Sequence, residues 1–473
     1  MKYSSTRGGA PVVGFEEALL AGLATDGGLY VPQSWPSLSY NEIKALAGLP
    51  YPELALKVIT PFVGEDFSQT ELQTMLADAY DGFTHKAIAP LVQLDSNDFL
   101  LELFHGPTLA FKDFAMQLLA RLMDKALANK GRRATIVGAT SGDTGGAAIE
   151  AFRGRDNIDV FILHPHNKVT EVQRRQMTTP TEGNVHNIAL EGNFDDCQHL
   201  LKALFNNHNL RDELQLAGVN SINWARIVGQ IPYYFSAATA LGAPYREVSF
   251  CVPSGNLGDI FAGFVAHKMG LSVGKLVIAT NVNDILARTL ETGRYETKGA
   301  VATDSPSMDI QVSSNFERLL FELSGHDSAW LNGFMDDFAQ NGAGLLGDKV
   351  HDKFKNLFAA HRLDDEGTGQ TIARIKAQSG YVADPHTAVR LGVAAMMRAQ
   401  EEIATSMPLV TLSTAHPAKF PDAVERATGE KPFQPETIVA QKKMPERFEV
   451  LENDFDAVAE HIKKRARAVT VPS

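Results

Sequence analysis

The chain has 473 residues, of which 44% are hydrophobic and 21% charged, so its composition is that of a globular protein with two to four domains. The formal net charge of −12, with no evident basic face, argues against nucleic acid as a general partner. No run of 18 consecutive apolar residues occurs and the amino terminus lacks an apolar signal-type stretch. We therefore expect a cytoplasmic protein without a membrane partner. Its two cysteines have no CxxC spacing, so neither a disulfide framework nor a metal site is predicted.

Residues 1–95 are predicted to form a separate, mainly helical unit. Segments 15–23 and 52–63 carry apolar residues at helical spacing. Paired glycines at Gly27 and Gly28, with prolines nearby, mark turns between these helices.

From about residue 98, apolar runs of strand length alternate with helical stretches. The runs are continuously apolar, as expected for parallel strands that are covered on both faces. This alternation predicts βαβ units and a parallel sheet. The predicted strands are 98–104, 134–139, 159–164, 185–190, 247–253, 275–280 and 408–413. Loops are predicted over 296–306 and 362–370, and an amphipathic helix over 454–466.

Lys112 lies between Phe111 and Asp113 at the start of a predicted helix. Apolar surroundings lower the pKa of a lysine, and a neutral amine can form an imine with an aldehyde. Alternatively, the lysine stem packs on Phe111 while its charged head reaches water. The segment alone leaves both interpretations open.

The helix after Lys112 has recognisable start and stop signals. Asp113 is predicted as its N-cap, and Gly131 as its C-terminal stop. An i, i+4 apolar stripe joins Phe114, Leu118, Leu122 and Ala126. A second helix start is predicted at Asp384 and Pro385.

Two glycine turns follow predicted strands and precede predicted helices. The first turn is residues 139–146, ATSGDTGG, and the second turn is residues 253–259, PSGNLGD. This arrangement directs unpaired backbone N–H groups at an anion, and such sites cluster beyond the carboxyl ends of parallel strands. Neither turn is a Walker motif or a full dinucleotide fingerprint. Each turn could also serve only to reverse the chain.

Two further segments carry candidate ligand groups. Segment 219–226, VNSINWAR, places small polar side chains before Arg226, whose planar fork suits a phosphate. It could equally be a capped helix with Arg226 on its solvent face. Ser413 and Thr414 end an apolar strand, where ligand groups are expected, although both hydroxyls could instead cap backbone groups.

Together these segments resemble the pyridoxal 5′-phosphate enzymes of fold type II, and most closely the threonine synthases, in the longer bacterial and fungal branch of that family. The matching segments run nearly from end to end: YSSTRG (3–8), HGPTLAFKDF (105–114), ATSGDTGG (139–146), NSINWAR (220–226), PSGNLGD (253–259), ATNVND (279–284) and STAHPAKF (413–420).

The resemblance implies an α/β fold with parallel twisted sheets flanked by helices. It also implies three domains: a mainly helical amino-terminal domain over 1–95, a large cofactor-binding domain over 96–133 and 226–473, and a small α/β domain over 134–225. The small domain is expected to close over the substrate to control water. A monomer or small homo-oligomer is expected.

The resemblance also implies which residues contact pyridoxal phosphate. Lys112 would form the Schiff base with the cofactor, and Thr414 would meet the pyridine nitrogen. Backbone N–H groups would bind the cofactor phosphate at Gly255, Asn256, Leu257 and Gly258.

The remaining implied contacts are with the substrate. The substrate carboxylate and the phenolic oxygen of the cofactor would be surrounded by Thr140, Ser141, Asp143 and Thr144. The substrate phosphate would be bound by Asn220, Ser221 and Arg226. Because an acid repels a carboxylate or phenolate, Asp143 is predicted only to line the site. The roles of His105 and His416 are left open.

The implied reaction converts O-phospho-L-homoserine and water to L-threonine and inorganic phosphate. The alternatives are another fold-type-II lyase, such as a threonine or serine dehydratase, and a non-catalytic relative. A dehydratase gives no reason for the 220–226 phosphate group or the long amino-terminal unit, and a non-catalytic relative would be expected to lack Lys112.

Overall fold

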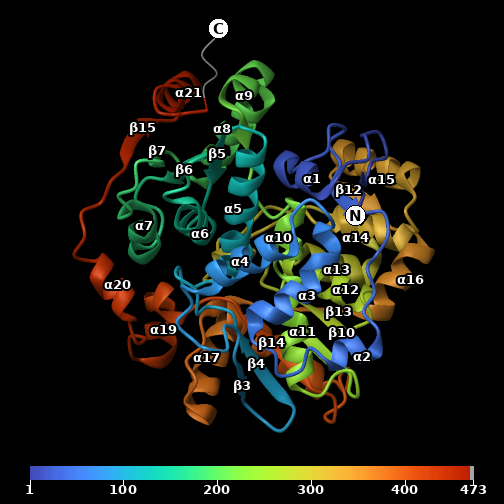
Figure 1. Ribbon diagram of the computed structural model, residues 1–473. Coiled ribbons are helices and arrows are strands. Elements are labelled where there is room, and N and C mark those ends of the chain that lie inside the picture. Colours follow the sequence, from blue (N-terminus) through green and yellow to red (C-terminus); the bar gives the residue numbers. More distant parts are fainter. Residues whose placement is uncertain (469–473) are drawn as a thin grey trace.

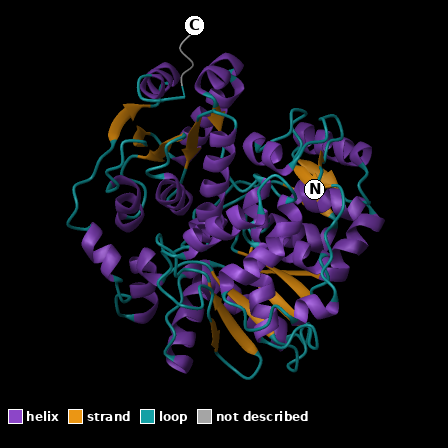
Figure 2. Cartoon of the chain, viewed as in Figure 1, coloured by secondary structure: helices purple, strands orange, loops and turns teal. Residues whose placement is uncertain are grey.

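Two separate sheets organise the chain in the computed structural model, which describes residues 1–468 (Figures 1 and 2). The larger sheet has the strand order β13-β10-β9-β14-β4-β3. Its strands are β3 (Leu91–Gln93), β4 (Asp98–Glu102), β9 (Val248–Pro253), β10 (Val273–Thr280), β13 (Phe358–Arg362) and β14 (Leu409–Ser413). All neighbours are parallel except β3 and β4. The carboxyl ends of the parallel strands therefore meet at one edge.

The smaller sheet is entirely parallel, in the order β15-β7-β6-β5-β8. Its strands are β5 (Ala134–Ala139), β6 (Ile158–Pro165), β7 (Val185–Glu191), β8 (Leu216–Ala217) and β15 (Glu449–Glu452). The flanking helices are α6 (Asp143–Phe152), α7 (Glu171–Thr178), α8 (Phe194–Asn206), α9 (His208–Leu214) and α21 (Phe455–Lys463). Each strand predicted from sequence is present within a few residues, and the predicted α/β architecture is confirmed.

The amino-terminal part is mainly helical, as predicted, but it shares one hydrophobic core with the larger sheet and its helices. Its elements are β1 (Tyr3–Ser5), α1 (Phe15–Ala21), β2 (Tyr30–Pro32), α2 (Tyr40–Lys44), α3 (Tyr51–Val63) and α4 (Gln69–Tyr80). The predicted boundary at residue 95 cuts through the larger sheet, because β3 pairs with β4.

The central helix α5 (Lys112–Asn129) packs against α4, α6 and α10 (Trp224–Val228) and so joins the parts of the molecule. The predicted stripe from Phe114 to Ala126 is buried. Gly131, with φ +61°, follows the helix end as predicted. The predicted N-cap is wrong: the helix starts at Lys112, and the Asp113 carboxylate instead accepts hydrogen bonds from Thr108.

Most of the other helices lie around the larger sheet, whereas α20 packs against α7 of the smaller sheet. They are α11 (Ile231–Ala240), α12 (Gly258–Lys268), α13 (Ile285–Thr292), α14 (Phe316–Ser324), α15 (Ser328–Asn341), α16 (Asp348–Leu357), α17 (Asp365–Ser379), α18 (Pro385–Ala399), α19 (Pro421–Thr428) and α20 (Glu436–Gln441). Asp384 caps α18 as predicted. The predicted loop at 362–370 is wrong, because α17 starts at Asp365.

The carboxyl-terminal segment corrects the predicted domain boundaries. After α20 the chain returns to the smaller sheet, where β15 pairs with β7 and the capped helix α21 packs on α8 (Figure 1). Residues 449–463 therefore belong with the smaller sheet, although the prediction assigned all of 226–473 to the large domain. Residues 469–473 of that range lie outside the described residues. Within the described chain, no helix is both long and apolar enough to cross a membrane.

Candidate active site

Lys112 and Thr414 are brought together by a backbone bridge between the segment before α5 and the segment after β14. Ala110 pairs with Ala415, and the Phe111 N–H donates to the Thr414 carbonyl at 2.8 Å. The larger sheet therefore fixes the start of α5 against the carboxyl end of one of its parallel strands, where ligand groups are expected.

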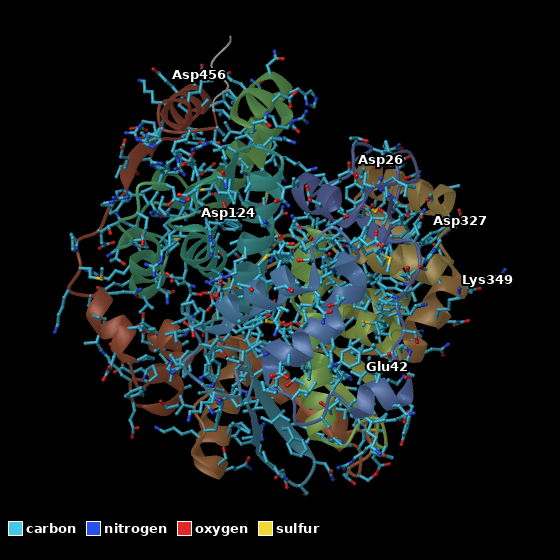
Figure 3. All side chains as sticks on the ribbon, in the orientation of Figure 1. Asp26, Glu42, Asp124, Asp327, Lys349 and Asp456 are labelled. Carbon is cyan, nitrogen blue, oxygen red and sulfur yellow. The ribbon has the colours of Figure 1, made fainter. Side chains whose placement is uncertain are left out.

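Lys112 is largely buried. Lys112 is 8% exposed, in contrast to Glu42, Asp327 and Lys349, which lie on the outside of the molecule (Figure 3). Burial lowers the pKa of Lys112, and the charges of Lys419 and Arg226 lower it further, whereas Asp143 partly raises it. Nζ also lies 4.9 Å from the Phe111 ring centroid, so the packing of the lysine against Phe111 that the alternative interpretation proposed is present as well.

Asp143, in the first turn of α6, lies between two lysines. Its Oδ1 is 2.8 Å from Lys419 Nζ, and its Oδ2 is 3.7 Å from Lys112 Nζ. Gln173 Nε2 also donates to Oδ1 at 2.9 Å. Burial opposes ionisation of the carboxyl, yet the two lysines lower the pKa of Asp143 below its ordinary value. Asp143 is thus an ionised carboxylate whose negative charge is balanced by the neighbouring lysines.

Lys419 is a site residue that the sequence interpretation missed. It is fully buried in a short 3-10 turn after β14, and its Nζ also donates to the Thr108 carbonyl at 2.8 Å. The available signal was a lysine between Ala418 and Phe420, immediately after a buried strand. Its partner could not be inferred, because Asp143 lies on a helix of the other sheet.

In the first turn, a side chain and two backbone N–H groups of the turn are hydrogen-bonded to one another. Thr140 Oγ1 accepts from the N–H groups of Gly142 at 2.9 Å and Gly145 at 3.0 Å. Thr140 can therefore offer a ligand only its hydroxyl proton. The half-buried side chains of Ser141 and Thr144 make no hydrogen bond to the described residues, so their hydroxyl groups are available.

The second turn leaves its backbone donors unpaired. The N–H groups of Gly255, Asn256, Leu257 and Gly258 donate to no acceptor within residues 1–468, and Leu257 has φ +60°. A Cβ at Gly255 would lie 2.9 Å from Ile310 Cγ1 and 3.1 Å from the Ser307 carbonyl oxygen. These features are typical of a backbone cradle that binds an anion.

Residues 313–315, which sequence reasoning did not single out, join the second turn to segment 219–226. Ser314 Oγ donates to Asn256 Oδ1 at 3.1 Å and lies 3.2 Å from Ser221 Oγ. Asn315 Nδ2 is within hydrogen-bond distance of both the Ser221 and the Asn256 carbonyls. Ser221 and the second turn are therefore neighbours in space.

Arg226 is a buried cation without an acidic partner in the part of the chain that the structure describes. It is 4% exposed, its Nη1 donates to the Val219 carbonyl at 3.1 Å, and its Nε has no partner among the described residues. Burial lowers the pKa of Arg226 to about 10, which still leaves it charged at neutral pH. The interpretation that placed it on a solvent face is wrong. Asn220, by contrast, is exposed, and its side chain contacts none of these groups through a hydrogen bond.

The two histidines have structural partners. His105 Nε2 lies 2.7 Å from Glu102 Oε2, and His416 Nδ1 accepts from the Ala418 N–H at 3.1 Å. Burial lowers the pKa of His416 to about 4, so its ring is neutral at physiological pH. Thr414 Oγ1 accepts from Arg390 rather than capping the backbone.

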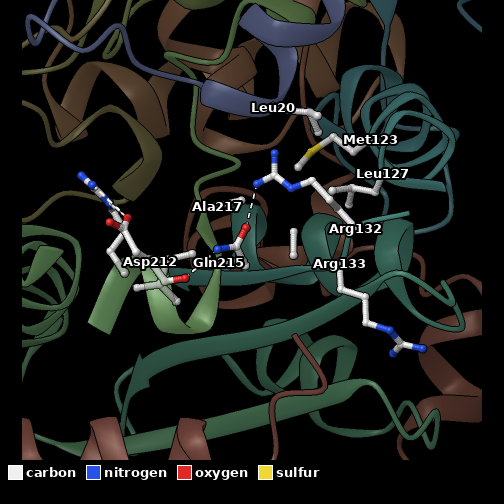
Figure 4. Close-up of a pocket in the computed structure, with 11 residues that line it drawn as sticks. Leu20, Met123, Leu127, Arg132, Arg133, Asp212, Gln215 and Ala217 are labelled. Carbon is white, nitrogen blue, oxygen red and sulfur yellow. Dashed lines mark hydrogen bonds and ion pairs between the residues drawn. The ribbon is translucent and has the colours of Figure 1, made fainter. Parts of the chain in front are cut away.

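A separate pocket of about 160 Å³ lies between α1, α5 and the edge of the smaller sheet, and contains none of the predicted site residues (Figure 4). Arg132 crosses it to donate to Gln215, and Leu20 and Met123 form its apolar side. Its arginines are also positive, but they are exposed or paired, unlike Arg226.

Comparison with known proteins identifies the family. Residues 2–80 match the model for the threonine synthase N terminus, 84–331 that for pyridoxal-phosphate dependent enzymes, and 387–462 that for the threonine synthase C-terminal region. A threonine synthase from Pseudomonas aeruginosa is 52% identical over 459 residues, covering 97% of each chain. The chain belongs to the threonine synthase family. It is a pyridoxal-phosphate-dependent enzyme, as predicted.

Solved threonine synthases have the same fold. A pyridoxal-phosphate-bound threonine synthase from Brucella melitensis is 55% identical with a TM-score of 0.96, covering 99% of this chain and 100% of that one. The yeast enzyme is 36% identical with a TM-score of 0.93, covering 98% of both chains. A tomato threonine deaminase, at 13% identity and a TM-score of 0.52, shares only the fold.

The residues of this threonine synthase family member fit the cofactor. The second turn offers unpaired N–H groups in a cradle that a Cβ at Gly255 would fill. Lys112 is a buried amine with a lowered pKa, and Thr414 lies beside it. An anion cradle, a reactive amine and a hydroxyl are what a phosphorylated pyridine aldehyde requires.

Proposed function

We propose that the enzyme converts O-phospho-L-homoserine and water to L-threonine and inorganic phosphate. The observation that carries this proposal is Arg226, a buried cation with no acidic partner among residues 1–468, in a centre that already has a separate backbone cradle. A buried unpaired charge is costly, so an anionic ligand is expected to neutralise it. A cofactor phosphate and a substrate phosphate together account for two anion sites.

In this proposal Ser221 and Arg226 bind the substrate phosphate before it leaves from the γ-carbon. Hydrogen bonds to charged groups are worth about 1.5–3 kcal/mol each, so these contacts also favour phosphohomoserine over homoserine. Asn220 would join them only if ligand binding draws it inward. The carboxylate of the substrate would be bound at the first turn, by the hydroxyls of Ser141 and Thr144 and the proton of Thr140.

Lys112 is proposed to move protons at the α- and β-carbons. An amine with a pKa lowered toward neutrality can both accept and return a proton. The cofactor, when bound, supplies the electron sink that makes the α-carbon proton removable. A lone Asp143 carboxylate would stabilise the protonated form of Lys112. Its ion pair with Lys419 is proposed to reduce this stabilisation, so that Lys112 can lose its proton.

The test compares two substrates. Incubation with phosphohomoserine should release phosphate and threonine in equal amounts, whereas incubation with threonine should yield little ketoacid. Ketoacid from threonine without phosphate release would support a dehydratase instead.

Arg226 gives a sharper test of the substrate site. Arg226→Ala should raise the KM for phosphohomoserine about tenfold or more while leaving cofactor affinity nearly unchanged, because one charged hydrogen-bonding group is lost. Arg153→Ala is a matched control, since Arg153 pairs with Glu150 and Glu182. An unchanged KM would remove Arg226 from the substrate site.

A further inference from the structure

Arg390, on α18, is a buried arginine directly behind Thr414. It is 0% exposed, its Nη2 donates to Thr414 Oγ1 at 2.9 Å, and its Nε donates to the His386 carbonyl at 2.9 Å. Its Nη1 has no partner among the described residues. Since burial of a guanidinium is costly, the contact between Arg390 and the Thr414 hydroxyl calls for an explanation in the chemistry of the site.

The contact between Arg390 and Thr414 has a fixed direction. A guanidinium can only donate hydrogen bonds, so the Thr414 oxygen must accept. The hydroxyl proton of Thr414 is then left over, and Thr414 Oγ1 has no other partner among residues 1–468. Thr414 is thereby prepared to donate to an acceptor in the site.

We propose that Arg390 is a positioning residue that makes the Thr414 hydroxyl a hydrogen-bond donor and so keeps the ring nitrogen of the cofactor unprotonated. This inference rests on the proposed function, in which Thr414 meets that nitrogen. If the ring nitrogen accepts a hydrogen bond from the Thr414 hydroxyl, its lone pair is used in that bond, so the nitrogen is not protonated. A positive charge there would also face the positive charge of Arg390.

The charges around Arg390 leave it an effective cation. The titratable groups near it are Asp384 and His386 at the start of α18, Asp259 on α12, Cys251 on β9, and Tyr381. Within residues 1–468, no carboxylate forms an ion pair with it. The Asp384 carboxylate is occupied by the His386 ring and the Thr387 hydroxyl. Asp259 accepts from the hydroxyls of two tyrosines, Tyr233 and Tyr234.

A purely structural role for Arg390 makes a different prediction. Its contact with the His386 carbonyl, and a longer one to Thr387 Oγ1 at 3.3 Å, could by themselves brace α18. In that case replacement of Arg390 would weaken the binding of every cofactor analogue equally. A role in directing the Thr414 proton would affect only ligands that can accept it.

The experiment uses two ligands with the full-length protein: pyridoxal phosphate, and its 1-deaza analogue, which has C–H in place of the ring nitrogen. In the wild type the natural cofactor should bind about tenfold more tightly, the worth of one directed hydrogen bond. Arg390→Met should reduce this ratio to about twofold, and Arg390→Lys, which retains a cationic donor, should restore most of it. A ratio that Arg390→Met leaves unchanged would overturn the inference.

Thr414→Ala separates this inference from the proposed function. If Thr414→Ala abolishes the preference for the natural cofactor and Arg390→Met does not, only the role of Arg390 fails. If Thr414→Ala leaves the preference unchanged, the assignment of Thr414 itself fails.

A second measurement needs no substitution and so does not depend on the folding of a variant. Nitrogen-15 NMR of labelled cofactor bound to the wild type should give a shift in the range of an unprotonated, hydrogen-bonded pyridine. A pyridinium shift would overturn the inference.

Discussion

The first turn and the second turn each follow a parallel strand and precede a helix with an aspartate in its first turn, Asp143 in α6 and Asp259 in α12. The first turn donates two of its N–H groups to Thr140, whereas four N–H groups of the second turn have no acceptor among the described residues. Two lysines lower the pKa of Asp143, while burial raises the pKa of Asp259 to about 6.

This difference arises from partners that lie far away in the sequence. Asp143 meets Lys419 from the segment after β14, and Asp259 meets the hydroxyls of Tyr233 and Tyr234 from α11. In two turns of similar sequence pattern, the pKa of the aspartate therefore shifts in opposite directions. The first offers side-chain hydroxyls beside a neutralised charge, and the second offers bare backbone donors for an anion.

Lys112 lies 3.7 Å from Asp143 of the first turn and is the proposed proton-transfer group, so its loss should have the largest effect. Lys112→Ala should reduce turnover by at least about 10³-fold, because the proton-transfer group is removed. Borohydride reduction of the wild type should attach the cofactor to the peptide that contains Lys112. Lys125→Ala, on the exposed side of the same helix, should retain activity. A yellow, borohydride-sensitive Lys112→Ala protein would falsify the assignment.

The second turn should be the more sensitive one for cofactor affinity. At Gly255→Ala the new Cβ would press on Ile310 and the Ser307 carbonyl, at 2.9 and 3.1 Å. Overpacking of this kind costs about 1–3 kcal/mol, so the Kd of the cofactor should rise about tenfold to a hundredfold. Equilibrium dialysis measures it. Gly333→Ala is the control, since a Cβ at Gly333 meets nothing within 4 Å. Equal Kd values for both variants would show that the second turn does not bind the cofactor.

The first turn should respond to the loss of Lys419. Lys419→Met leaves Lys112 as the remaining lysine beside the Asp143 carboxylate, which keeps its hydrogen bond from Gln173. Breaking a buried ion pair costs about 3 kcal/mol of folding free energy. Because Lys419 lowers the pKa of Lys112, its removal should raise that pKa.

The measurement is the rate at which cofactor attaches to the apo-protein as a function of pH. The half-maximal rate of Lys419→Met should occur at a higher pH than in the wild type, while Lys419→Arg should remain close to the wild type. A profile that does not move would show that Lys112 is insensitive to the charge of Lys419.

Local sequence patterns predicted the elements and the motifs well. Apolar runs such as 134–139 and 247–253 predicted strands because parallel strands are buried on both faces. The capping of α18 by Asp384 was also predictable from two adjacent residues. The N-cap at Asp113 was wrong because Thr108, five residues away, is its partner instead.

Long-range pairing could not be predicted from the same patterns. The strand β15 is exposed and short, and only its pairing with β7 reveals that the chain returns to the smaller sheet. Lys419 and Ser314 acquire their roles from residues on other elements, Asp143 and Asn256. Local sequence spacing does not encode such contacts. The family resemblance did not supply them either, because it assigned roles only to residues with a known role in the family motifs.

The smallest expected effect tests the two aspartates directly. Because the pKa of Asp259 is raised to about 6, the native protein keeps its proton to a higher pH than the unfolded chain does. Its contribution to stability is therefore present at low pH and is lost as pH rises through 6. Between pH 5 and 7.5 the wild type should lose about 1 kcal/mol relative to Asp259→Asn. Asp143 is ionised in both states over this window, so Asp143→Asn should differ from the wild type by a constant amount. Urea unfolding with saturating cofactor measures both, and parallel pH profiles for the two variants would contradict the contrast between the turns.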